Sequence, residues 1–181
     1  MSRDLRPRLW HLAAALAVVA ADRVSKGLVM EHIAPYRSIP ILPGLFDLTY
    51  VENPGGVFGI FKGLDEGLRA ILFTAVPAVA IALIAIYSRS VPAAHRLTQY
   101  SLALILGGAI GNLIDRLWLG YVVDFLDFYW RSHHWPAFNV ADSAICVGVG
   151  LLMLEAALAP RRDPEAQVPP PAVEPSGRDT P

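Results

Sequence analysis

The sequence predicts a mainly α-helical membrane protein with four transmembrane helices, and with a small β-rich platform and a loop on the outer side. Two observations favour this fold class. Of the 181 residues, 54% are hydrophobic and only 17% are charged, whereas soluble domains carry roughly 25% charged residues. The apolar residues also gather in four long runs, each near the roughly 20 residues that a bilayer requires. One integral membrane domain is therefore expected over residues 1–159.

The four runs justify the helices one by one. The first follows three arginines but then meets Asp22, Arg23 and Lys26 in place of a small-residue cleavage site. It is therefore interpreted as a retained span and not as a removed secretory signal. The expected spans lie at about residues 9–30, 68–87, 97–117 and 138–159.

Positive charges predict the orientation of the spans. They precede the first span, occupy the link between the second and third, and follow the fourth. Because short cytoplasmic flanks are enriched in lysine and arginine, both termini are expected in the cytoplasm. Residues 31–67 and 118–137 then face outward, and residues 160–181, rich in proline and charge, are expected to form a disordered cytoplasmic tail.

The first outer segment is too long for a mere connection. Apolar residues between positions 39 and 51, broken by prolines, predict short strands that turn near Pro43 and Gly44. The glycine-rich stretch that follows permits close backbone approach, and a lid is expected at residues 53–61. The second outer segment is expected to be a loop that holds Asp124.

Several polar residues interrupt the ends of the apolar runs, where ionisable groups are costly and indicate function. Asp22 and Lys26 are spaced for an intrahelical pair, with the lysine reaching outward as structural support. Asn112 and Arg116 share one helical face and could hold the backbone carbonyls of a substrate, while Asp115 is expected to be neutralised by Arg116.

The apolar runs also contain glycines and the single cysteine of the chain. The glycines before Asn112, among them Gly108, let a neighbouring helix or a ligand come close. The lone cysteine, Cys146, excludes an internal disulfide and is expected to be inertly packed. The formal net charge of −1, without a basic stripe, offers no case for nucleic-acid binding.

Asp124 and Asp142 are the candidate catalytic pair. The loop from the third span returns the chain to the same outer level, so the two acids can face each other and share a water molecule. Two close carboxyl groups cannot both ionise readily. One can act as general base towards water while the other polarises a carbonyl, which is peptide hydrolysis of the aspartic type and requires no metal or cofactor. Ser143 has no neighbouring histidine, and His133 and His134 lack zinc-site spacing.

The stretches DRVSK, ENPGGVFG, GGAIGNLIDRLWLGYVVDF and FNVADSAI occur in that order. Together they resemble the motifs of bacterial lipoprotein signal peptidase (signal peptidase II), over roughly residues 9–159. The resemblance implies that Asp124 and Asp142 are catalytic. It also implies a supporting or substrate-binding role for matching polar residues, glycines and one aromatic residue: Asp22, Lys26, Asn53, Gly55, Phe58, Gly108, Asn112, Arg116 and Asn139.

The substrate that the resemblance implies is a prolipoprotein whose cysteine carries diacylglycerol, cut immediately before that cysteine. The expected enzyme is a monomer in the bacterial inner membrane, in contact with lipid, and its site faces the periplasm. Two alternatives come from other functional classes. Asp115, Asp124 and Asp127 could bind a cation in a lipid head-group transferase, or the same acids could relay protons in a small carrier.

Overall fold

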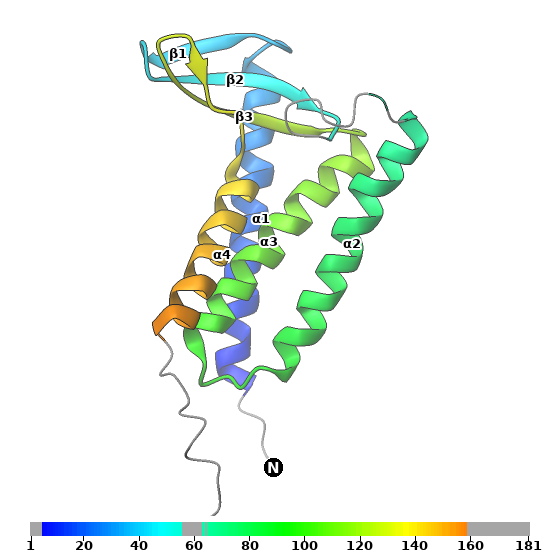
Figure 1. Cartoon of the computed structure of the whole chain (residues 1–181), viewed down its shortest axis with the longest axis vertical. Helices are drawn as coiled ribbons and strands as arrows, with labels where there is room; N and C mark the ends of the chain where they lie inside the picture. Colours follow the sequence, from blue (N-terminus) through cyan, green and yellow to red (C-terminus); the bar gives the residue numbers. More distant parts are fainter. Residues whose placement is uncertain (1–4, 56–62, 64, 159–181) are drawn as a thin grey trace, which may run out of the picture.

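The computed structural model describes residues 5–55, 63 and 65–158. Its four helices run side by side, and a small sheet lies across one end of them (Figure 1). The helices are α1 (Leu5–His32), α2 (Glu66–Ser90), α3 (Arg96–Trp118) and α4 (Val140–Leu158). The strands are β1 (Ser38–Leu42), β2 (Phe46–Asn53), β3 (Val122–Trp130) and β4 (His133–His134).

The mainly helical fold with a small antiparallel sheet is confirmed. Three of the described helices, α2, α3 and α4, are long and apolar enough to cross a membrane. The first predicted span falls on α1, where Asp22, Arg23 and Lys26 interrupt the apolar run. The predicted tail at residues 160–181 lies outside the described residues.

The sheet has the order β1-β2-β3-β4, with antiparallel neighbours. The predicted turn near Pro43 and Gly44 is confirmed, because the chain reverses there between β1 and β2 and Gly44 has a φ of 85°. The expected loop after α3 is wrong: residues 122–130 form the longest strand. The physical reason is the free edge of β2, which accepts a run rich in β-branched and aromatic residues.

The register of β2 and β3 brings the first outer segment to the site. Asn53 at the end of β2 pairs with Val122, and Val51 pairs with Asp124. Below this pair of strands, the buried side chains of Val29, Tyr50 and Val123 belong to one hydrophobic cluster with Ile33 and Phe125. The sheet is thus fastened to the upper end of α1 by apolar packing.

Helix α3 is central and packs against each of the other three helices, whereas α2 packs on α3 alone among the described elements. Glycines allow the close contacts of α3. A Cβ atom at Gly107 would lie 2.6 Å from the Ala15 carbonyl oxygen of α1. On α4, a Cβ atom at Gly148 would lie 2.7 Å from both the Ser101 carbonyl oxygen and Ile105 Cγ1. The helices therefore touch through their backbones at these points.

The two glycines of α4 provide a matched test of this packing. Gly148→Ala should lower the free energy of unfolding by about 1–3 kcal/mol, because the added methyl group overpacks the contact with α3. Gly150→Ala, where a Cβ atom meets nothing within 4 Å, should be neutral or stabilising by at most about 1 kcal/mol. Thermal unfolding in detergent measures both, and equal effects of the two changes would contradict the contact.

Candidate active site

The two predicted catalytic acids lie at the end of the helix bundle that the sheet covers. Asp124 is the third residue of β3, and Asp142 is in the first turn of α4. An isolated bridge between Leu126 and Phe138 returns the chain to β3 just before α4 begins. The start of α4 is therefore held next to the strand that carries Asp124.

Asn139 joins the two acids. Its side-chain Nδ2 donates a hydrogen bond to Asp124 Oδ1 at 2.7 Å, and its backbone nitrogen donates to Asp142 Oδ2 at 3.3 Å. In return, the backbone nitrogen of Asp142 donates to Asn139 Oδ1 at 2.9 Å. This reciprocal arrangement is a helix capping box built by the local sequence Asn-x-x-Asp. One fully buried asparagine thus starts α4 and sets both carboxyl groups.

Each acid also receives a second amide. Asn53 Nδ2 donates to Asp124 Oδ2 at 2.9 Å, and Asn112 Nδ2 donates to Asp142 Oδ1 at 2.7 Å. The carbonyl oxygen of each of these amides also has a partner. Asn53 Oδ1 accepts from the Gly55 backbone nitrogen at 3.0 Å, and Asn112 Oδ1 accepts from Lys26 Nζ at 3.0 Å. The predicted residues Asn53, Asn112 and Asn139 are therefore brought together around the two acids.

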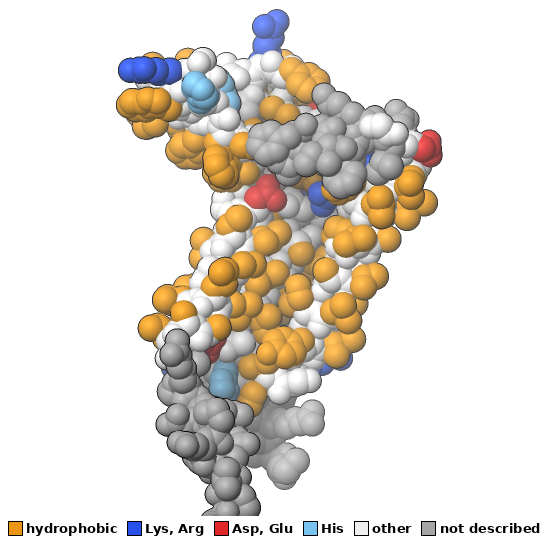
Figure 2. Space-filling view, viewed as in Figure 1, with side chains coloured by type: hydrophobic (Ala, Val, Ile, Leu, Met, Phe, Trp, Pro, Cys, Tyr) orange, Lys and Arg blue, Asp and Glu red, His pale blue; other side chains and the backbone are white. Residues whose placement is uncertain are grey.

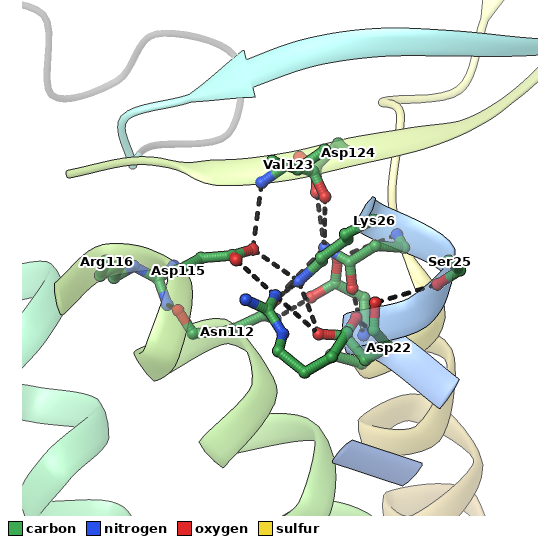
Figure 3. Close-up of polar contacts among 12 residues, drawn as sticks. Asp22, Ser25, Lys26, Asn112, Asp115, Arg116, Val123 and Asp124 are labelled. Atoms are coloured by element: carbon green, nitrogen blue, oxygen red, sulfur yellow. Dashed lines mark hydrogen bonds and ion pairs between the residues drawn. The ribbon is translucent and has the colours of Figure 1, made fainter. Parts of the chain in front are cut away.

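A buried cluster of charges lies beside this group and is drawn in Figure 3. Lys26 Nζ lies 2.9 Å from Asp22 Oδ2, 2.7 Å from Asp115 Oδ2 and 3.0 Å from Asn112 Oδ1. Arg23 forms ion pairs with Asp22 and Asp115. The cluster connects α1 to α3 through charges that are removed from water, so each charge depends on its partners.

The carboxylates of the cluster also hold the backbone on which the site is built. Asp115 Oδ2 accepts a hydrogen bond from the Val123 nitrogen at 3.2 Å, next to Asp124. Asp22 Oδ1 accepts one from the Ala141 nitrogen at 3.1 Å, next to Asp142. The cluster thereby positions the two segments that carry the acids.

Two predictions about these charges are wrong. Lys26 forms the predicted pair with Asp22 but does not reach outward: only 1% of its surface is exposed, because three oxygen ligands lie inside the bundle. Asp115 pairs with Lys26 and Arg23, not with Arg116, because Asp115 points towards α1. Arg23 was not predicted as part of the site. Its position next to Asp22 in the sequence does not indicate that it also pairs with Asp115 on another helix.

Arg116 keeps donors available at the site. Its described hydrogen bond is a long one, 3.5 Å from Nη1 to the carbonyl oxygen of Asn112, and its buried Nε atom makes none. Asp142 and Asp124 both act on its charge. A half-buried guanidinium beside two acids, with unused N–H groups, can bind a carbonyl or carboxyl oxygen of a ligand.

The remaining predicted residues lie at other positions. Gly108 packs against α4, since a Cβ atom there would lie 2.3 Å from the Ala141 carbonyl oxygen. Gly55 has a φ of 104° and lies against the Phe73 ring of α2. Phe58 and most of the predicted lid lie outside the described residues. Cys146 is exposed on α4 and is not packed inside, because its face of the helix has no neighbour among the described elements.

Side chains proposed for other chemistries are separated from the pair. His134 Nδ1 lies 3.0 Å from Asp127 Oδ1 at the edge of the sheet, and Ser143 Oγ donates to the Asn139 carbonyl oxygen at 2.9 Å. Within the described residues, no group of three His, Cys, Asp or Glu side chains is arranged to hold a metal ion. Asp115, Asp124 and Asp127 do not form the cation cluster that one alternative required.

The family model described as "Signal peptidase (SPase) II" matches residues 14–158. The chain belongs to the signal peptidase II family. It is therefore a peptidase, and the family resemblance predicted from its motifs is confirmed. The lipid head-group transferase and the proton-coupled carrier are not favoured.

Relatives of this signal peptidase II support the assignment along most of the chain. The lipoprotein signal peptidase of Geobacter metallireducens is 51% identical over 148 residues, 82% of this chain and 90% of the relative. That of Syntrophotalea carbinolica is 47% identical over 143 residues, 79% and 88% of the two chains. A solved "bacterial membrane enzyme" has a TM-score of 0.69 at 28% identity, covering 82% and 92%. The chain is thus a multi-pass membrane protein.

Burial gives Asp124 unusual acid–base behaviour. Desolvation raises the pKa of its carboxyl group to about 7, against the opposing hydrogen bond from Asn53, and the nearby charge of Asp142 raises it further. A carboxyl group with such a pKa is partly protonated at neutral pH, so it can donate a proton as well as accept one.

This pKa predicts a pH-dependent stability. Because the folded pKa of about 7 lies above the ordinary value of 3.8, the folded state binds more protons than the unfolded state between those values. The free energy of unfolding should therefore fall as pH rises through that window, by at most about 4 kcal/mol, and level off above it. Asp124→Asn should remove this decline in detergent unfolding experiments at a series of pH values. Parallel profiles for both proteins would contradict the raised pKa.

Proposed function

We propose that this chain is an aspartic endopeptidase that removes the signal peptide from diacylglyceryl-modified prolipoproteins by cutting before the lipidated cysteine. The observation that carries the proposal is the bridge of Asn139 between Asp124 and Asp142. Two carboxyl groups held by one asparagine can act on the same water and the same peptide bond. Membership of the signal peptidase II family supports the class of substrate.

The environments of the acids suggest their roles. Burial disfavours the ionised form of Asp142, but its place at the N-terminus of α4 and the hydrogen bond that it accepts from Asn112 both favour that form. We assign it the role of general base, which takes a proton from water as the water oxygen attacks the scissile carbonyl carbon. Asp124, with its raised pKa, carries the proton that it donates to the carbonyl oxygen.

The resulting intermediate has two hydroxyl groups on the former carbonyl carbon. When the carbon–nitrogen bond breaks, Asp142 returns its proton to the leaving nitrogen, and Asp124 takes a proton back from one hydroxyl group. One water molecule is consumed and both acids regain their starting states. The coupled pair therefore needs no external proton donor.

Asn112 and Arg116 have different supporting roles: the first positions Asp142, and the second binds the substrate. Asn112 donates to Asp142 and accepts from Lys26 and Asn139, so its amide positions the base. Arg116 has unused donors and is the better candidate to hold a backbone carbonyl of the substrate. Gly55, two residues after β2, has a φ of 104° and lies against the Phe73 ring, so it supports the turn that holds Asn53.

We also propose that α1 is a fourth membrane span. Several of its large apolar side chains are exposed, while Asp22, Arg23 and Lys26 form ion pairs inside the bundle. The large apolar side chains that are more than half exposed are Leu9, Trp10, Leu12, Leu16, Val24 and Leu28. Apolar side chains cover much of the visible helical surface in Figure 2. Both termini then lie in the cytoplasm of a bacterium, with the site at the outer side of the inner membrane and the enzyme acting as a monomer among lipids.

The catalytic pair has a matched control on the same strand. Asp124→Asn and Asp142→Asn should each lower kcat by at least about 10³-fold, because each removes one proton-transfer role. Asp127→Asn, whose acid contacts His134 at the sheet edge, should retain activity. The assay is cleavage of a diacylglyceryl-modified precursor in EDTA, with circular dichroism to verify folding.

Activity in either Asn variant comparable to that of the unmodified chain would refute the catalytic pair. Loss of the unmodified chain's activity in EDTA would instead favour metal-dependent chemistry. In the same assay Arg116→Gln should raise KM more than it lowers kcat. An unmodified precursor should remain uncut if the diacylglycerol group is recognised.

Membrane crossing by α1 can be tested by labelling its two flanks. In a Cys146→Ala background, Glu31→Cys should react with a membrane-impermeant thiol reagent in right-side-out vesicles, because it lies at the outer end of α1. Ser2→Cys should react only after the vesicles are opened. Labelling of both positions before opening would show that α1 does not span.

A further inference from the structure

The end of the bundle opposite the sheet contains a cavity, far from the catalytic pair. Here the start of α1, the end of α2 and the start of α3 come together (Figure 1). The cavity has a volume of about 290 Å³, which is space for roughly ten water-sized groups. Its walls are largely apolar and include Leu12, Ala15, Ala85 and Leu106. It exists because α2 packs on α3 and not on α1.

Most polar groups that line this cavity already have protein partners. Gln99 Nε2 donates to the carbonyl oxygens of Ser88 and Val91, at 3.0 and 2.9 Å, and its Oε1 accepts from Ser88 Oγ at 3.1 Å. These bonds tie the end of α2 to α3. Gln99 and Ser88 are therefore structural, and neither calls for a ligand.

His11 is different. Only 7% of its surface is exposed, and its Nδ1 atom is buried without a hydrogen-bond partner. Its ring packs edge-on against Tyr100, with the centroids 4.7 Å apart, so the imidazole cannot simply turn away. A buried polar atom without a partner is energetically unfavourable. The cavity beside it is the place from which a ligand atom could satisfy it.

The charges at this end select the chemistry of that ligand. Arg89 lines the cavity, and Arg96 at the start of α3 acts electrostatically on His11. Glu155 of α4 accepts hydrogen bonds from Thr98 on the face of α3 that packs against α4. The cavity therefore combines largely apolar walls with a lining arginine, and a second arginine acts on His11.

We propose that this cavity binds one anionic phospholipid of the leaflet that borders this end of the bundle. One acyl chain lies along Leu12, Ala15 and Leu106, and the phosphate accepts a hydrogen bond from His11 and faces the two arginines. Basic pockets between transmembrane helices are suited to anionic head groups. By filling the space between α1 and α2, the lipid holds α2 in place beside α3.

Native mass spectrometry in detergent tests the site without any substrate, so its outcome is independent of the proposed peptidase activity. The probes are dioleoyl-phosphatidylglycerol and dioleoyl-phosphatidylcholine. The first phosphatidylglycerol should bind at least about fivefold more tightly, the factor expected from one arginine at a membrane surface. His11→Phe and Arg89→Gln should each reduce this preference.

A matched pair of variants on α2 tests the location. Ala85→Phe fills the cavity and should weaken binding of the first lipid by about tenfold or more, whereas Ala82→Phe, on an exposed position of the same helix, should bind as the unmodified chain does. Equal affinity for both lipids would overturn the proposal, as would unchanged binding in Ala85→Phe. If Ala85→Phe left lipid binding unchanged but raised the KM for the precursor, the cavity would instead be assigned to the signal peptide.

Discussion

The ion pairs of Lys26 with Asp22 and Asp115 are the interaction on which the rest of the site depends. A buried ammonium group is tolerated only if carboxylates surround it, and two helices supply them. Each carboxylate also accepts a hydrogen bond from a backbone nitrogen: Asp115 Oδ2, which contacts the lysine as well, accepts from Val123, and Asp22 Oδ1 accepts from Ala141. The charge cluster thus positions both β3 and the start of α4 relative to the bundle.

Asn139 then positions the side chains of the two acids relative to each other. Its amide reaches Asp124 while its backbone caps the turn that contains Asp142. Because these bonds are buried or partly buried, the loss of one leaves a polar group without a partner and weakens the others. The two acids are therefore held by the same network but in different surroundings, one on a strand of the sheet and one at a helix N-terminus. Different surroundings are what an acid–base pair requires.

The two ends of the molecule are built differently. At the sheet end, charges and amides join α1, α3 and α4 into one rigid framework. At the opposite end, α2 is joined to α3 through Gln99 and leaves a cavity towards α1. Catalysis needs atoms held in fixed positions, so the dense network lies where the chemistry is proposed. The looser end leaves room for lipid.

Much of this protein was determined by local sequence. The apolar runs predict the four helices, because hydrophobic length is a property of consecutive residues, and Asn139 with Asp142 forms a capping box within one turn. The motifs containing Asp124 and Asp142 sufficed to predict the family. Only the tertiary structure decided that Lys26 turns inward, that Asp115 pairs with Arg23 and Lys26, and that residues 122–130 become a strand. Those outcomes depend on partners from distant segments, such as the free edge of β2, and no local pattern encodes which distant surface a side chain will meet.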